Sequence, residues 1–394
     1  MKRRSFIQTS GLASAAMLTP AFLRAGVRPA ASSRQGKILV VIQLSGGNDG
    51  LNTIIPYGDD IYYSQRPTLS IPPAEVLTLN DYQGLHPALA PLRELYDLGQ
   101  LAVLNGVGYP EPDRSHFRSM DIWQTGSGSR QNWSTGWLGR YLDHLPRNQH
   151  AYHAIEVDDG LSLAMKGAEQ RGFAMGDPNR LRRAVRNPLL PESAHAQVHQ
   201  QHTVSYLYET LTRTSEAADY LYEKSRIYRS RQPYPPGNFG RDLKQVAELI
   251  TADTDTQVYY LSLTGFDTHA RQLGMHQRLL DQYAKGVSAF VKDLKQNRLF
   301  EDVIIMTFSE FGRRLAQNGS GGTDHGTANN VTLIGGDLKR AGLLNAPSSL
   351  SHLDRGDLIF DVDFRRLYAT LLNRWLDAPA DQILMNNFEP LDFI

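Results

Sequence analysis

Acidic and imidazole side chains follow several strand-like segments of the sequence, at the points where those segments end. The clearest case is Asp267 with His269, which come shortly after the apolar segment 258–263. An aspartate and a histidine two residues apart at the end of a buried strand form a compact pair of metal ligands. The alternative is that Asp267 caps the following helix while His269 stacks on an aromatic ring.

Three further loops, each joined to a strand-like segment, carry groups of the same kind. The loops are 45–50, 309–312 and 323–326, and they carry Asp49, Glu310 and His325. Asp49 has an ordinary glycine-rich turn as its alternative, and Glu310 has a surface ion pair with Arg313. Because ligands of α/β proteins bind at the carboxyl ends of the strands, the four loops together predict one metal site at one edge of a sheet.

Ser115 is a candidate nucleophile, since it stands where a helix is expected to begin. The N–H groups at a helix start hold anions such as phosphate and sulfate. The neighbouring Arg114 and His116 would steady a transferring oxyanion. A metal nearby would lower the pKa of the hydroxyl, and Ser119, one turn later, is the second candidate. The alternative is that Ser115 caps the helix.

The composition limits both the chemistry and the partners. The 394 residues include 41 Lys and Arg against 41 Asp and Glu, so no basic excess points to nucleic acid. There is no cysteine, which excludes disulfides and thiolate ligands. A metal would therefore be a divalent ion held by His, Asp or Glu, with zinc, magnesium, manganese and calcium all left open.

The N-terminal residues follow the order of an export signal. A basic head precedes a short apolar segment, 11–23, and a cluster of small residues, 25–31. The pair Arg3-Arg4 resembles a twin-arginine signal, which implies that the twin-arginine export machinery is a partner. The sequence predicts a signal peptide in 1–31 and a domain in 34–394 that is periplasmic or secreted. It predicts no stable membrane span after signal removal. A cytosolic amphipathic helix is the alternative.

Strand-like and helix-like segments alternate along the rest of the chain. The predicted strands are 37–44, 101–106, 152–157, 257–263, 302–308 and 331–335, and the predicted helices are 86–98, 204–228, 239–252, 270–296 and 364–375. This alternation predicts a mainly parallel sheet with helices on both faces. The polar segment at about 167–238 is predicted to be a helical insertion. Its histidines His195, His199 and His202 are interpreted as part of a solvated helix, with a metal site as the alternative.

The order of these motifs resembles exported bacterial proteins grouped as "domain of unknown function 1501". The residues that carry the resemblance are the twin-arginine signal and the segments 44–52, 114–117, 265–269, 308–313 and 323–326. That family is similar to the alkaline phosphatase and sulfatase superfamily, which implies one large three-layer α/β/α sandwich. By position, the resemblance implies metal ligands at Asp49, Asp267, His269 and His325, and a nucleophile at Ser115.

Two departures from the phosphatase pattern leave the ligand set open. The spacing of Asp267 and His269 is shorter than the resemblance implies. Glu310 stands where phosphatases place an adjacent Asp-His pair, and Phe311 replaces the histidine. A single metal, an altered set that uses His116 or Asp324, and a degenerate site that only binds are therefore all open.

The sequence thus predicts an exported, metal-dependent hydrolase of phosphate or sulfate esters, acting on a small molecule or a polymer. Ser115 would attack the ester, while Arg114 and His116 would steady the oxyanion or the leaving group. The predicted metal ligands are Asp49, Asp267, His269, Glu310 and His325. The alternative is a non-catalytic binding or assembly protein of the cell envelope on the same scaffold.

Overall fold

The computed structural model describes residues 36–146, 150–186 and 202–394. The predicted signal peptide lies outside the described residues, as do His195 and His199. Residues Lys37 to Ile394 form one structural unit, and this unit contains every other residue predicted to take part in the chemistry.

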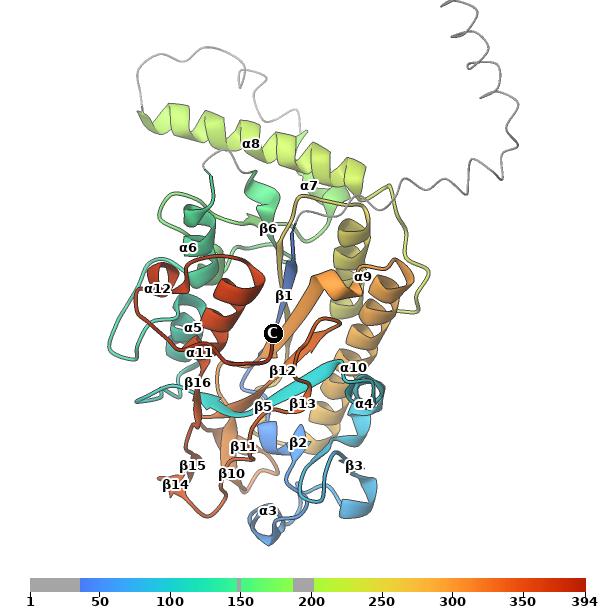
Figure 1. The fold of residues 1–394 in the computed structure, drawn as a ribbon, viewed down its shortest axis with the longest axis vertical. Coiled ribbons are helices and arrows are strands. Elements are labelled where there is room, and N and C mark those ends of the chain that lie inside the picture. Colours follow the sequence, from blue (N-terminus) through green and yellow to red (C-terminus); the bar gives the residue numbers. More distant parts are fainter. Residues whose placement is uncertain (1–35, 147–149, 187–201) are drawn as a thin grey trace, which may run out of the picture. The chain divides into compact units, whose positions relative to one another are not determined.

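The central sheet has nine strands, in the order β13-β5-β12-β9-β1-β8-β6-β7 with β16 paired to β5 (Figure 1). The strands are β1 (Ile38–Ser45), β5 (Leu101–Gly108), β6 (Ala154–Glu156), β7 (Phe173–Ala174), β8 (Val258–Thr264), β9 (Val303–Phe308), β12 (Asn329–Gly335), β13 (Gly342–Leu343) and β16 (Val362–Asp363). Strand β12 is antiparallel to both of its neighbours, and the other pairs of this sheet are parallel. The predicted mainly parallel sheet is confirmed.

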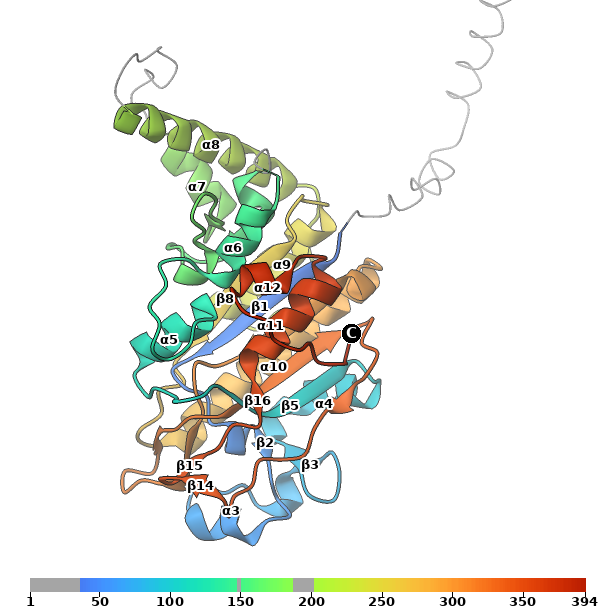
Figure 2. The same cartoon turned by 60° about the vertical axis from the view of Figure 1, so that its left-hand side comes forward.

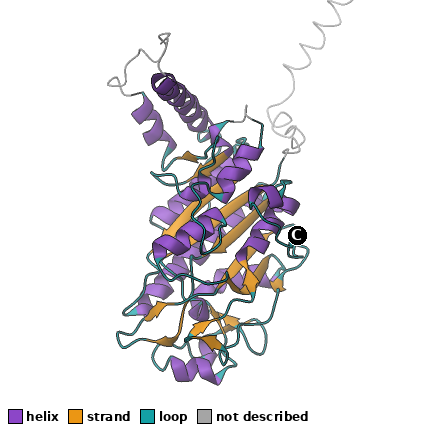
Figure 3. Ribbon diagram, turned by 90° about the vertical axis from the view of Figure 1, so that its left-hand side faces the viewer, coloured by secondary structure: helices purple, strands orange, loops and turns teal. Residues whose placement is uncertain are grey.

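Helices cover both faces of this sheet (Figures 2 and 3). One layer contains α4 (Ala90–Asp97), α9 (Asn238–Thr251) and α10 (Gln272–Gln296), and the other contains α5 (His116–Thr125), α6 (Trp137–His144), α11 (Phe364–Thr370) and α12 (Ala380–Ile383). Val40 of β1 packs in the first layer and Val41 packs in the second. Both are fully buried, which stabilises the fold by about 1.5–3 kcal/mol for each side chain. The three-layer α/β/α architecture is confirmed.

The described part of the segment predicted as a helical insertion, which leaves out residues 187–201, contains one strand and two helices. Strand β7 lies at the edge of the sheet, so the first residues of this segment belong to the central layer. Helices α7 (Pro178–Val185) and α8 (His202–Lys224) follow it. Asp219 of α8 accepts hydrogen bonds from Arg182, at 2.8 Å, and from Arg186, at 2.9 Å, which ties the two helices together.

Smaller elements lie beside the carboxyl ends of the strands. Strands β10 (Arg313–Gln317) and β11 (Thr323–His325) form an antiparallel hairpin in which Arg313 pairs with His325. A second small sheet, β2-β4-β3, contains Ile54–Ile55, Gly84–Leu85 and Leu77–Thr78. The spacing of apolar residues in the sequence did not predict these short strands. No helix in the described part of the chain is both long and apolar enough to cross a membrane.

Glu156, at the carboxyl end of β6, is expected to make the stability of the fold depend on pH. The side chain is only 5 % exposed, and burial raises the pKa of its carboxyl from 4.5 to about 7. Between these values the folded protein keeps a proton that the unfolded chain releases. The contribution of the protonated Glu156 to the free energy of unfolding is therefore fully present below pH 4.5 and is lost as the pH rises through 7. In Glu156→Gln, this loss should be absent.

Urea unfolding of both proteins at pH 5 and pH 8 measures the effect. Relative to the wild type, Glu156→Gln should gain about 2.5 kcal/mol of stability between the two pH values. Other titrating groups cancel in this difference. A gain of zero would contradict the buried, protonated carboxyl.

Candidate metal centre

The parallel strands β1, β8 and β9 bring three of the predicted loops to one edge of the sheet. Ser45 is paired with Thr264, and Gln43 is paired with Phe308, so the three strands end side by side. The hairpin β10-β11 and the first turn of α5 complete the site. Loops that are far apart in the sequence therefore meet there, as the sequence predicted.

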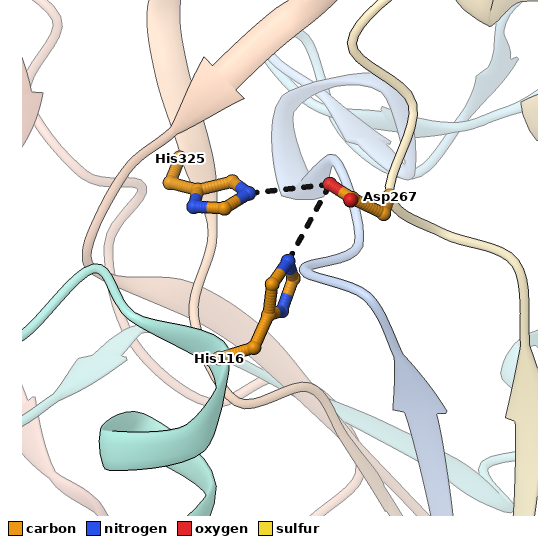
Figure 4. Close-up of side chains that lie close together, drawn as sticks. All are labelled: His116, Asp267 and His325. Atoms are coloured by element: carbon orange, nitrogen blue, oxygen red, sulfur yellow. Dashed lines mark hydrogen bonds and ion pairs between the residues drawn. The ribbon is translucent and has the colours of Figure 1, made fainter.

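Three histidines surround one carboxylate oxygen at this edge. The ligand atoms of His116, Asp267 and His325 all lie within 4.8 Å of one another (Figure 4). The Nε2 atoms of His116 and His325 are 3.5 Å and 3.2 Å from Asp267 Oδ1. The Nε2 atom of His269 lies 3.0 Å from the same oxygen. These four side chains are called the His-Asp cluster below.

Each imidazole ring of the cluster is held by its other nitrogen. The Nδ1 partners are Glu310 Oε1 for His116 at 2.9 Å, Arg114 O for His325 at 2.8 Å and Asp324 Oδ1 for His269 at 3.3 Å. A carbonyl or carboxylate oxygen only accepts, so in a neutral ring Nδ1 carries the proton and donates it. The lone pair then lies on Nε2. All three lone pairs therefore point toward Asp267, and a carboxylate or carbonyl behind each ring is the usual arrangement for metal-binding histidines.

The distances among His269, His325 and Asp267 are close to those expected around a single cation. Ligand atoms that each lie about 2.0–2.2 Å from one tetrahedral zinc ion are about 3.3–3.6 Å apart. The Nε2 atoms of His269 and His325 are 2.9 Å apart, slightly closer than this. The three Nε2 atoms lie 3.0–3.5 Å from Asp267 Oδ1. Among the residues that the structure describes, the buried Nε2 atom of His116 has no hydrogen-bond partner. A cation would satisfy this nitrogen and would separate the two facing lone pairs of His269 and His325.

The electrostatic environment keeps the carboxylate of Asp267 ionised. Burial alone would raise its pKa, but the hydrogen bond and positive charge of Arg313 outweigh burial and lower the pKa to about 2. The hydrogen bond to Glu310 raises the pKa of His116, whereas burial lowers the pKa of His325. A metal bound at His116 would therefore compete with protonation, and its affinity should fall as the pH is lowered.

Arg313 lies beneath the cluster and is 1 % exposed. Its guanidinium donates to Asp267 Oδ1 at 2.8 Å. It also donates to four backbone carbonyls, those of Gly46, Gly47, Phe266 and Thr323. The hydrogen bonds of the described residues do not join Arg313 to Glu310, so the surface-pair interpretation of these two residues is wrong. Arg313 instead fixes the loops that follow β1 and β8.

Glu310 lies behind His116 and is 1 % exposed. Its Oε1 atom accepts from Nδ1 of His116 and from the backbone N–H of Gly46, at 2.8 Å. Its Oε2 atom accepts from the hydroxyl of Ser309 at 3.1 Å. The structure thus uses Glu310 to orient His116, although the sequence placed Glu310 among the metal ligands and His116 at the oxyanion.

Asp49 is fully buried and its carboxylate is used elsewhere. Its Oδ2 atom accepts from Arg66 at 2.6 Å and from the amide of Gln272. Burial opposes ionisation, but the charge of Arg66 lowers the pKa of this carboxyl below its ordinary value. The structure does not bring Asp49 into the His-Asp cluster.

Ser115 begins α5, one residue before His116, and is exposed. Its side chain makes no capping hydrogen bond to the helix, and its backbone N–H donates to Asp113 Oδ1 at 2.7 Å. The hydroxyl is therefore not used as a cap. Ser119, the second candidate, is fully buried and donates to the carbonyl of Asp113. Arg114 forms an ion pair with Asp357 at 3.3 Å.

Gly46 is expected to be irreplaceable, because its backbone touches the loop that carries Asp267. Its φ is +120°, and a Cβ atom added to it would lie 2.4 Å from the backbone nitrogen of Asp267. Gly46→Ala should therefore displace Asp267 and lower the affinity for zinc, measured by competition with a chelator. Gly99→Ala is the matched control, since Gly99 has a φ of +68° and nothing within 4 Å of an added Cβ. Equal zinc affinity in both variants would contradict the close approach.

The fold and the site together define a three-layer α/β protein with a histidine-rich metal-type centre at the carboxyl edge of its sheet. The sequence model of the family "Protein of unknown function (DUF1501)" matches residues 96–373, more than half of the 394-residue chain. The chain belongs to this family, as its motifs indicated. No curated protein is significantly similar to it in sequence.

Several solved structures are similar to the chain at low sequence identity. The zinc complex of the C-terminal periplasmic domain of EcEptC from Escherichia coli has a TM-score of 0.38 and 9 % identity, over 77 % of this chain and 74 % of that one. The lipoteichoic acid synthase LtaP from Listeria monocytogenes has a TM-score of 0.34 and 9 % identity, over 80 % and 68 %. The PsFucS1 sulfatase from Pseudoalteromonas sp. has a TM-score of 0.38 and 10 % identity, over 91 % and 74 %.

Proposed function

We propose that the protein is an exported, zinc-dependent hydrolase of phosphate or sulfate esters. The observation that carries the proposal is the His-Asp cluster, in which three imidazole nitrogens face one ionised carboxylate oxygen. Among zinc, magnesium, manganese and calcium, a site with three imidazoles favours zinc, because the other three ions prefer oxygen ligands. His116, Asp267, His269 and His325 would hold the ion, and Asp49 is left out because its carboxylate is bound to Arg66.

A zinc ion in this cluster would supply a Lewis acid that polarises the ester and lowers the pKa of a bound hydroxyl group or water. The protein's own residues would orient the reacting groups. Glu310, Asp324 and the carbonyl of Arg114 hold the three imidazoles in the tautomer with the proton on Nδ1, which leaves the lone pair of Nε2 facing Asp267. Arg313 keeps Asp267 ionised. The N–H groups at the start of α5, which directly follows Ser115, would offer hydrogen-bond donors to an ester oxyanion bound there.

Ser115 is the proposed nucleophile. Its oxygen would form a bond to phosphorus or sulfur while the bond from that atom to the ester oxygen breaks. The proton of the hydroxyl would pass through solvent to the departing alkoxide, which leaves as an alcohol. Water would then attack the same phosphorus or sulfur, release phosphate or sulfate, and return a proton to the serine oxygen. The support for this role is the position of Ser115 beside His116 and its lack of a capping bond.

The test is a comparison of zinc-loaded wild type with zinc-loaded Ser115→Ala. Both proteins are assayed with p-nitrophenyl phosphate, bis-p-nitrophenyl phosphate and p-nitrophenyl sulfate. The wild type should bind one zinc ion and turn over at least one of these esters, and Ser115→Ala should bind zinc equally well but lose turnover. Zinc binding without any turnover would instead support the non-catalytic binding protein. Unchanged turnover in Ser115→Ala would remove the serine from the mechanism.

Export rests on the order of basic, apolar and small residues in 1–31 and on the Arg3-Arg4 pair. Fusing this segment to a reporter that folds before transport should place the reporter outside the cytoplasm. Arg3→Lys with Arg4→Lys should keep it inside.

A further inference from the structure

A buried amide lies between the two loops that carry most of the His-Asp cluster. Gln272 is the first residue of α10 and is 0 % exposed. Its Oε1 atom accepts from the hydroxyl of Thr268 at 3.2 Å and from the hydroxyl of Thr323 at 2.7 Å. Thr268 stands between Asp267 and His269, and Thr323 is two residues before His325. One amide oxygen therefore joins the loop after β8 to the hairpin β10-β11.

The other end of this amide is bound to an ion pair. Its Nε2 atom donates to Oδ2 of Asp49, which also accepts from Arg66 at 2.6 Å. Arg66 is 0 % exposed and donates further to the carbonyls of Arg314 and Leu315, at 2.8 Å each. Because a carboxylate only accepts, Asp49 fixes which end of the amide faces it, and the oxygen of the amide must face the threonines. The five side chains of Arg66, Asp49, Gln272, Thr268 and Thr323 are called the Gln272 network.

We infer that Gln272 is a positioning residue, which holds the loop after β8 and the hairpin β10-β11 at the spacing that makes His269 and His325 face Asp267. It acts through Thr268 and Thr323. Asp49 acts through Gln272, since it orients the amide. The readout by zinc affinity rests on the proposed function, whereas the local order of the two loops does not.

A role as a core filler would make a different prediction. Methionine has nearly the length and volume of glutamine, but it neither donates to Asp49 nor accepts from the threonines. Gln272→Met therefore keeps the packing and leaves the hydroxyls and the carboxylate of this network without their shared partner. If Gln272 only fills space, Gln272→Met should affect hydrogen exchange and zinc affinity no more than a Gln→Met substitution at another buried position.

Hydrogen exchange of the metal-free protein tests the inference directly. In Gln272→Met, the backbone amides of 265–271 and 321–326 should both exchange faster than in the wild type. Zinc affinity should fall by about tenfold to a hundredfold, as is usual when the partners behind metal ligands are removed. Gln83→Met is the matched control, because Gln83 is 3 % exposed and bonds to Asn105. It should leave both segments and the zinc affinity unchanged.

A double-mutant cycle shows whether Thr323 acts through the amide. Thr323→Val should lower zinc affinity in the wild-type background but add little in Gln272→Met, because the shared bond is already lost. If Gln272→Met does not fold, Thr268→Val combined with Thr323→Val removes both donors to Oε1 and replaces it in the exchange experiment.

The outcomes separate this inference from the proposed function. Wild-type exchange in both segments of a folded Gln272→Met protein would overturn the positioning role, whatever its zinc affinity. Faster exchange in both segments of Gln272→Met, together with a wild-type protein that binds no zinc, would uphold the positioning role and would defeat the proposed function.

Discussion

Replacing His116 or His325 with alanine should lower the affinity for zinc by roughly a hundredfold or more. Four-ligand zinc sites in small peptides have apparent binding free energies of about 10–16 kcal/mol, so one ligand in four accounts for about 3 kcal/mol. The Nε2 atom of His116 has no hydrogen-bond partner in the described part of the chain, and the Nε2 atom of His325 lies 3.2 Å from Asp267 Oδ1. Competition with a chelator of known affinity measures the loss, and turnover should disappear with it.

Two control variants should lower zinc affinity less than His116→Ala or His325→Ala, or not at all. His352→Ala removes an exposed histidine outside the His-Asp cluster and should leave zinc affinity unchanged. Asp324→Asn removes only the charge behind His269, so it should weaken binding by about tenfold. Wild-type affinity in His116→Ala would show that this ring is not a ligand.

Replacing Arg313 with methionine should destabilise the fold by about 4 kcal/mol or more. The guanidinium is 1 % exposed and bonds to the carbonyls of Gly46, Gly47, Phe266 and Thr323. Each buried carbonyl left without a donor costs about 1–3 kcal/mol. Methionine fills part of the space but donates to none of them. Urea unfolding of the metal-free protein measures the loss without any contribution from zinc.

Arg130→Met is the matched control, since Arg130 is 82 % exposed and pairs with Glu111 at the surface. Exposed ion pairs contribute little to stability, so this variant should unfold at nearly the same urea concentration as the wild type. If Arg313→Met were equally harmless, the loops at the site would not depend on the buried guanidinium.

The fold was largely predictable because its main strands are buried on both faces. Continuous apolar segments such as 37–44 and 302–308 became β1 and β9 with shifts of one residue. The antiparallel direction of β12 was not predictable, since an apolar strand has the same composition in either direction. The hairpin β10-β11 was missed because its strands are short and polar and lack the alternation of apolar and polar residues that predicts a strand. Arg313 and His325, which pair in it, are both polar.

The site was predictable as a set of loops but not as a set of contacts. Asp267, His269 and His325 were expected to meet, and the structure brings their ligand atoms together. Asp49 was predicted from its place after β1, but Arg66 binds its carboxylate. Nothing in the sequence marks Arg66 as its partner, because the two residues are brought together by α3 (Asp60–Gln65) and the loop that follows it.

Gln272 shows most clearly which site residues the sequence alone does not predict. A glutamine at the start of a long amphipathic helix is ordinary in a sequence, and its importance comes from burial and from the two threonines that it joins. Such a role depends on the distance in space between Gln272 and Thr323, which are 51 residues apart in the sequence. A hydroxyl directly beside a predicted ligand, as in Asp267-Thr268-His269, is the only local signal that pointed toward it.

X-ray absorption at the zinc edge of the zinc-loaded protein tests the ligand set most directly. The His-Asp cluster predicts one zinc ion with three imidazole ligands and one or more oxygen ligands at about 2.0–2.2 Å. The imidazole contribution should fall to two in His325→Ala. A shell of oxygen atoms alone, or an imidazole count that does not change in His325→Ala, would contradict the cluster as the metal site.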